Sequence, residues 1–327
     1  MEIKELLDRV LDGGKISRAE AIELVNCADK GALYKASERV TRHWMGDKFD
    51  CCSIINAKSG NCSEDCKWCA QSAFYKTKVE KYPMVDKMES LRQGEHNYGQ
   101  GIGRFSLVTS GRKLSAKDVR EVGEHYKLLR EKCGIKRCAS FGLMEYEDLV
   151  YLKECGVDTY HCNMETSKSY FGKLCTTHTP DDKQHTIQAA RKAGMRVCSG
   201  GIIGMGESME DRVDMAIMLR EMGIRSIPLN ILQPIKGTPL GESAPLTEQE
   251  ILTTIAIFRM INPRAFIRFS GGRAQLSPES QRLSLKIGVN AAITGDLLTT
   301  VGSTVERDMR LIRKAGYKLD IDTDWDE

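Results

Sequence analysis

Short apolar runs alternate with charged, amphipathic segments along most of this 327-residue chain. The runs have the length of strands, and the segments between them carry apolar side chains at helical spacing. Expected strands are 52–57, 104–109, 137–141, 159–163, 196–203, 226–232, 265–270 and 291–294. Expected helices include 115–132, 146–155, 180–193, 208–222 and 247–260. Such alternation predicts an α/β fold with a parallel sheet, because each helix carries the chain back to start the next strand.

Eight strand–helix units over this length fit a closed (β/α)8 TIM barrel, and an open or six-unit partial barrel is the alternative. We assign residues 46–320 to the barrel domain and the acidic residues 321–327 to a C-terminal tail. Residues 1–45 form an N-terminal helical extension, because Gly13-Gly14 ends a first helix and Ser17 to Glu20 has the form of a capping box.

Composition argues against nucleic-acid-binding, membrane-spanning and secreted proteins. A formal net charge of +3 gives no basic footprint for nucleic acid. No apolar run is long enough for a membrane span, and the charged start lacks the apolar core of a signal peptide, so we expect a cytoplasmic protein. Twelve cysteines in that compartment favour thiolate chemistry and metal binding over disulfides.

Three cysteines, Cys62, Cys66 and Cys69, lie within eight residues in a polar stretch. Three thiolates on a 4Fe–4S cluster leave one iron open to bind a small molecule, whereas a structural zinc site normally closes with four ligands. The C-x3-C-x2-C spacing resembles that of radical S-adenosylmethionine (AdoMet) enzymes, in which the open iron chelates AdoMet. The alternatives are a zinc knuckle with Cys52 as fourth ligand, or three unrelated buried thiols.

A second thiol set lies in the expected strands. Cys138, Cys162 and Cys198 fall in the third, fourth and fifth strands, where they could face a shared lumen. Arg268, in the seventh strand, would be a costly buried charge without an anionic partner such as a thiolate cluster. Together they predict a second cluster; alternatively, each cysteine is a small buried hydrophobe. Six further cysteines receive no role: Cys27, Cys51, Cys52, Cys133, Cys155 and Cys175.

From about residue 53 to residue 313, the chain resembles biotin synthase. The resemblance rests on matching stretches at 58–72, 197–207, 227–232, 236–240, 266–273 and 297–300. It implies a homodimeric (β/α)8 barrel that converts dethiobiotin to biotin by radical sulfur insertion. It also implies a 4Fe–4S cluster on the three-cysteine loop, bound AdoMet, an auxiliary iron–sulfur cluster that donates the sulfur, and an electron donor such as flavodoxin or ferredoxin.

The resemblance also implies residue roles. Those for AdoMet are Trp68, Asn163, Glu165, Lys183, Gly201, Ile203 and Gly204. Those for dethiobiotin are His161, Asn230, Thr299 and Thr300. An amide such as that of Asn230 carries the donor and the acceptor that a urea needs. The alternatives are strand-end caps for the asparagines and threonines, a turn for the glycines, and loop anchoring for Trp68.

The chain departs from the family pattern at the auxiliary cluster. Ser106 stands where the family has a cysteine ligand, and His161-Cys162-Asn163 replaces Asn-His-Asn. We hypothesise that Cys162 takes over, so that Cys138, Cys162 and Cys198, with Arg268, hold the cluster. Three thiolates favour a four-iron cluster over the family's 2Fe–2S, and ligation by Ser106 is the weaker alternative.

Two other function classes stay open on the sequence. One is another radical AdoMet enzyme of the same barrel type, such as a hydrogenase-cofactor maturase or a methylornithine-forming mutase. The other is a non-catalytic protein that stores iron or zinc.

Overall fold

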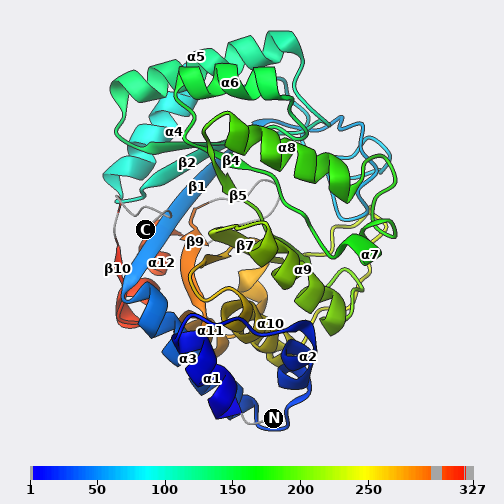
Figure 1. Cartoon of the computed structure of the whole chain (residues 1–327). Coiled ribbons are helices and arrows are strands. Elements are labelled where there is room, and N and C mark those ends of the chain that lie inside the picture. The colour runs from blue at the N-terminus through cyan, green and yellow to red at the C-terminus, as the bar shows by residue number, and fades with distance from the viewer. Residues whose placement is uncertain (1–2, 296–303, 320, 322–327) are drawn as a thin grey trace.

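The computed structural model describes residues 3–295, 304–319 and 321, and its centre is a closed parallel barrel (Figure 1). Hydrogen-bonded neighbours follow the order β1-β2-β3-β4-β5-β7-β8-β9, and β9 pairs back to β1. β5 and β6 occupy one strand position, because both pair with β7. The strands are β1 (Lys48–Lys58), β2 (Arg104–Thr109), β3 (Lys136–Ser140), β4 (Thr159–His161), β5 (Arg196–Cys198), β6 (Gly201–Ile203), β7 (Ser226–Ile231), β8 (Phe266–Phe269) and β9 (Val289–Ile293).

Helices surround the barrel and cover its outer face. Most of them begin at a Ser, Thr or Asp that caps the first turn, as at Thr179, Ser208 and Thr247. The helices after β1 are α4 (Lys87–Gly99), α5 (Ala116–Lys132), α6 (Tyr146–Cys155), α7 (Lys168–Phe171), α8 (Pro180–Lys192), α9 (Met209–Glu221), α10 (Glu248–Ile261), α11 (Pro278–Ile287) and α12 (Val305–Lys314).

Three helices precede the barrel: α1 (Ile3–Leu11), α2 (Arg18–Asn26) and α3 (Lys30–Met45). They lie together at one end of the molecule beside α9, α10 and α11 (Figure 1). The Ser17–Glu20 capping box at the start of α2 is present as predicted. A short strand, β10 (Lys318–Leu319), pairs with the first residues of β1.

The expected closed barrel is confirmed, with two local differences. The fourth strand ends at His161, and the expected strand 196–203 is broken at Ser199-Gly200. A methyl group on Gly200 would lie 1.9 Å from the carbonyl oxygen of Pro228, so this contact between strands requires glycine.

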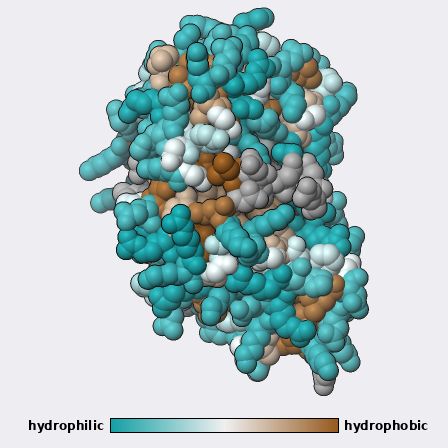
Figure 2. Space-filling view, turned by 90° about the vertical axis from the view of Figure 1, so that its left-hand side faces the viewer, coloured by the Kyte–Doolittle hydropathy of each residue, from teal (hydrophilic) through white to brown (hydrophobic). Residues whose placement is uncertain are grey.

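The surface in Figure 2 is mostly hydrophilic, and hydrophobic residues gather near the middle of the face shown, with smaller areas elsewhere. Within the described part of the chain, no helix combines the length and the apolar character that crossing a membrane requires.

Candidate active site

A cavity of about 350 Å³ runs through the barrel interior and is lined by every strand position. Side chains two residues apart in one strand face it, as period-two geometry requires. From β1 these are Cys52 and Ile54, and from β4 they are Thr159 and His161. The volume lies within the range of small-molecule sites.

Four of the inward-facing side chains form a layer deep in the barrel: Cys52, Cys138, Cys198 and Arg268. They come from β1, β3, β5 and β8, which are the first, third, fifth and seventh strand positions. Interior layers of (β/α)8 barrels are built from alternate strands in this way. Cys52 and Cys138 lie close enough for their thiols to affect each other's pKa, and Arg268 lies close enough to Cys52 and Cys198 to interact electrostatically.

The expectation that Cys162 faces the same lumen is wrong. Thr159, His161 and Asn163 line the cavity, so Cys162 falls on the opposite side of the chain and packs in the hydrophobic core. Cys52, which the sequence analysis left without a role, supplies the third thiol instead. The position of the fourth strand was predicted correctly, but the face of the strand that looks into the barrel was not.

A buried carboxylate holds two buried arginines beside the layer. Asp50 is buried between two buried arginines, accepting from Arg104 Nε at 3.1 Å and pairing with Nη2 of Arg268. Burial raises the pKa of Asp50, but Arg268 and Arg104 outweigh it and hold the pKa below its ordinary value. Arg268 favours the thiolate form of Cys198, but burial outweighs this effect and raises the pKa of Cys198 to about 11. Sequence analysis missed Asp50 and Arg104. The period of two residues in a strand could have found them, because Asp50 precedes Cys52 by two residues and Arg104, which lines the cavity, precedes Ser106 by two.

The three-cysteine loop follows β1 directly, at the carboxyl end of the barrel strands. Its backbone is folded on itself: the Cys62 amide donates to the Gln71 carbonyl at 2.9 Å, and the Cys69 amide donates to the Cys66 carbonyl at 3.0 Å. Trp68 and Cys69 line the mouth of the cavity. Burial raises the pKa of Cys69 to about 11, so binding of iron must displace its proton.

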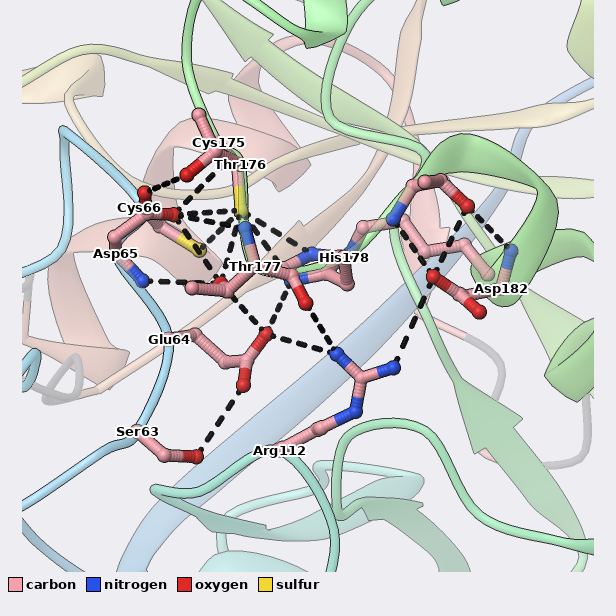
Figure 3. A network of polar contacts seen from close by, with 12 residues as sticks. Ser63, Glu64, Asp65, Cys66, Arg112, Cys175, Thr176, Thr177, His178 and Asp182 are labelled. Atoms are coloured by element: carbon pink, nitrogen blue, oxygen red, sulfur yellow. Dashed lines mark hydrogen bonds and ion pairs between the residues drawn. The ribbon is translucent and has the colours of Figure 1, made fainter.

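A polar network ties this loop to the loop after α7 (Figure 3). Glu64 Oε2 lies 2.6 Å from His178 Nδ1 and accepts from Thr177 Oγ1 at 2.9 Å. Asp65 Oδ1 accepts from the Thr176 amide at 2.9 Å. These contacts join segments more than 100 residues apart and fix the loop at the barrel mouth.

Glu165 lies on the cavity wall with features of a binding residue. Its backbone is left-handed, with φ 71, an uncommon conformation for a side chain that is not glycine. Its Oε2 is a buried atom with no hydrogen-bond partner among the described residues, while Oε1 lies 4.0 Å from Lys183 Nζ. Burial raises the pKa of Glu165, and Lys183 opposes this rise. Lys183 therefore stands behind Glu165 instead of lining the cavity.

The glycine segment reaches the cavity through one of its side chains. Gly201, Ile203 and Gly204 do not line the cavity, whereas the side chain of Ile202 does. A methyl group on Gly201 would lie 2.4 Å from the carbonyl oxygen of Glu165. Glycine is thus needed here so that the Glu165 backbone can approach β6.

Two predicted substrate residues lie on the cavity wall between the loop and the thiol layer. Asn230 is partly engaged, because its Oδ1 accepts from the Gly271 amide at 2.9 Å and its Nδ2 donates to the Gly201 carbonyl at 3.2 Å. One N–H and one lone pair remain for a ligand. His161 lines the same wall. Thr299 and Thr300 lie outside the described residues.

His161 should stay neutral at physiological pH. Burial, with smaller effects of Lys183 and Arg268, lowers its pKa from 6.5 to about 4.

The lowered pKa of His161 predicts a dependence of stability on pH. As pH falls from 6.5 to 4, the unfolded chain takes up a proton that the folded protein does not, so the free energy of unfolding should fall in that window. Urea unfolding of the cluster-free protein as a function of pH measures this slope. His161→Gln should reduce it, and a slope unchanged from wild type would contradict the assignment. His185→Gln, at an exposed site, is the matched control for the substitution.

Fold and site together define a radical AdoMet enzyme: a (β/α)8 barrel whose first strand leads into a loop with three thiols at the cavity mouth. Comparison with known protein families agrees. Residues 57–219 match the radical SAM superfamily, and residues 228–318 match the biotin and thiamin synthesis associated domain.

Full-length relatives specify the family. The chain is 56% identical to the biotin synthase of Porphyromonas gingivalis over 324 residues, covering 99% of this chain and 98% of that protein. It is 54% identical to the biotin synthase of Parabacteroides distasonis over 327 residues, with both chains fully covered. The chain belongs to the biotin synthase family, whose members are sulfur-inserting radical AdoMet enzymes.

Solved structures show the fold alone. Methylornithine synthase matches with a TM-score of 0.82 at 20% identity, covering 96% of this chain and 97% of that one. The FeFe-hydrogenase maturase from Carboxydothermus hydrogenoformans matches with a TM-score of 0.81 at 13% identity, covering 96% and 78%. The two enzyme alternatives from the sequence analysis therefore share the barrel with this chain, whereas its sequence is that of a biotin synthase.

Proposed function

We propose that this chain converts dethiobiotin to biotin, with the chemistry confined to one cavity. The observation that carries the proposal is that a three-thiol loop stands at the cavity mouth and a second three-thiol layer lies at its floor. A radical generator and a sulfur source are the two components that this reaction needs. The same reading divides the chain into the extension 1–45, the barrel 46–320 and the tail 321–327.

The residues at the mouth fit a 4Fe–4S cluster with AdoMet. When bound, this pair supplies a radical able to take hydrogen from an unactivated carbon. Cys62, Cys66 and Cys69 would hold three irons. The unpartnered Oε2 of Glu165 would accept from a ligand hydroxyl or amine, and a bound donor there offsets the cost of its burial. Trp68, which packs against the cluster of Leu174, Met205 and Leu232, would cover the adenine.

Dethiobiotin would occupy the wall between mouth and floor. Asn230 would offer its remaining N–H and lone pair to the ureido ring, and a neutral His161 would donate to the ureido oxygen. Because Asn230 is already held by two backbone groups, its orientation is fixed before the ligand binds. Such pre-organisation places the reacting carbons between the two clusters at little entropic cost.

The floor suits an auxiliary iron–sulfur cluster held by Cys52, Cys138 and Cys198. Arg268 would lie against the cluster, with its guanidinium held in place by Asp50. Three protein thiolates again leave one iron without a protein ligand, so we favour a four-iron cluster that carries an extra sulfide for donation. Mössbauer spectroscopy with iron and sulfide counts tests this, because two cubes hold about eight irons per chain and a 2Fe–2S cluster would leave about six.

An anaerobic assay tests the function. With a reductant, AdoMet and dethiobiotin, the reconstituted protein should form 5′-deoxyadenosine and biotin. Cys69→Ala should abolish both products, because the cluster that cleaves AdoMet loses a ligand. Deoxyadenosine without biotin from the wild type would favour a different radical AdoMet reaction. Neither product would favour an iron-storing protein without catalysis.

The reaction also implies partners. A flavodoxin or ferredoxin would supply electrons, and a homodimer in the cytoplasm is the expected state. Reduction of the reconstituted protein by flavodoxin and by ferredoxin tests the electron donor, and analytical sedimentation tests the dimer.

A further inference from the structure

Cys175 and His178 stand beside the radical cluster loop without a part in the proposed reaction. Cys175 Sγ lies 3.7 Å from Cys66 Sγ, 3.3 Å from His178 Nδ1 and 3.9 Å from His178 Nε2. The three side chains bring their ligand atoms within 4.8 Å of one another. Cys175 and His178 are buried, and they reach Cys66 from a loop that lies between α7 and α8 (Figure 3).

These spacings match one tetrahedral metal ion. Two thiolates at 2.3 Å from a tetrahedral zinc lie about 3.8 Å apart, and a thiolate and an imidazole nitrogen lie about 3.6 Å apart. Thiolates on different irons of a cube are held much farther apart than this. The geometry therefore fits a mononuclear ion and not a shared position on the 4Fe–4S cluster.

The histidine is already oriented for such a role. Its Nδ1 lies 2.6 Å from Glu64 Oε2, and Glu64 also accepts from Arg112 Nη1 at 3.3 Å. A carboxylate on one ring nitrogen fixes the tautomer and leaves the other nitrogen free to bind a metal. Here the free nitrogen is Nε2, on a ring packed edge-on against Phe171.

We propose that, in the cluster-free protein, Cys66, Cys175 and His178 bind one borderline-soft divalent cation such as Zn²⁺ or Fe²⁺. Thiolate and imidazole are the ligands that such ions prefer. Asp65 Oδ1 lies 3.2 Å from Cys175 Sγ, but the amides of Thr176 and Thr177 already donate to it. The fourth position is therefore left to water, which keeps the ion exchangeable.

Cys66 cannot serve this ion and the cluster at the same time. This consequence rests on the proposed function, in which Cys66 is a cluster ligand. An ion on Cys66, Cys175 and His178 is then a state that precedes cluster assembly or competes with it.

Cobalt binding tests the site. The full-length, cluster-free, reduced protein should bind one Co²⁺ per chain, with the intense d–d bands of a tetrahedral thiolate site. Cys175→Ser and His178→Gln should each weaken binding by about tenfold or more. Cys69→Ser should bind as the wild type does, and so should Cys27→Ser, a remote control. Loss of binding in Cys69→Ser with retention in Cys175→Ser would place the ion on Cys62, Cys66 and Cys69 and overturn the proposal.

X-ray absorption spectroscopy of the zinc-loaded wild type identifies the metal ligands directly and does not depend on the folding of a variant. Two sulfur ligands with nitrogen or oxygen support the proposed site, whereas three sulfur ligands contradict it. One equivalent of Zn²⁺ should also slow cluster reconstitution in the wild type but not in Cys175→Ser. If zinc binds through two sulfurs and reconstitution is unaffected, the metal site stands and the role of Cys66 in the cluster is wrong.

Discussion

Replacing Cys52 by alanine is expected to remove the auxiliary cluster and halve the iron content, from about eight to about four irons per chain. Biotin formation should fall below detection, while AdoMet cleavage by the intact radical cluster continues. The physical reason is the interior layer: Cys52 lines the cavity with Cys138 and Cys198, whereas the adjacent thiol of Cys51 packs in the hydrophobic core. Iron and sulfide analysis with separate assays of deoxyadenosine and biotin measures the three effects.

Two cysteines provide matched controls for this prediction. Cys51 is the neighbour of Cys52 on the opposite face of β1 and packs in the hydrophobic core. Cys162, the ligand expected from the sequence, lies in the same core. Alanine at either position should retain the auxiliary cluster. Loss of that cluster in Cys162→Ala with retention in Cys52→Ala would restore the sequence-based ligand set.

Asp50→Asn is expected to lower the free energy of unfolding by about 3–5 kcal/mol, the cost of leaving buried charges without their partner. Asn has nearly the same volume, so the loss would come from charge and not from a cavity. Arg104 and Arg268 are both almost fully buried and share the Asp50 carboxylate. Urea unfolding of the anaerobic, cluster-free protein measures the change.

Asp47→Asn is the matched control, because Asp47 pairs with Lys318 at the surface, where ion pairs contribute little. Equal stability losses in the two variants would show that the buried ion pairs of Asp50 contribute no more to stability than a surface ion pair.

The stabilising effect of Asp50 should also depend on pH. Because the arginines lower the pKa of Asp50, its stabilising charge should be lost only as pH falls below the ordinary range of a carboxyl group.

Much of the architecture could be predicted from local pattern. The helix 146–155 agrees to the residue with α6, because its apolar spacing is clear and Gly156 ends it in a left-handed conformation. The helix α4 was not predicted, since Gly94 and several polar residues weaken its apolar stripe. Gly94 is nevertheless used: a methyl group there would lie 2.7 Å from Leu129 of α5.

The sequence by itself determined the barrel, the three-cysteine loop and the family, since each depends on spacing along the chain. Tertiary structure alone decided which cysteines share the barrel interior. A shift of one residue in a strand moves every side chain to the other face of the sheet. No local sequence signal showed whether Cys52 or Cys162 faces the barrel interior. The same holds for Cys175 and His178, which meet Cys66 only because the folded barrel brings two distant loops together at its mouth.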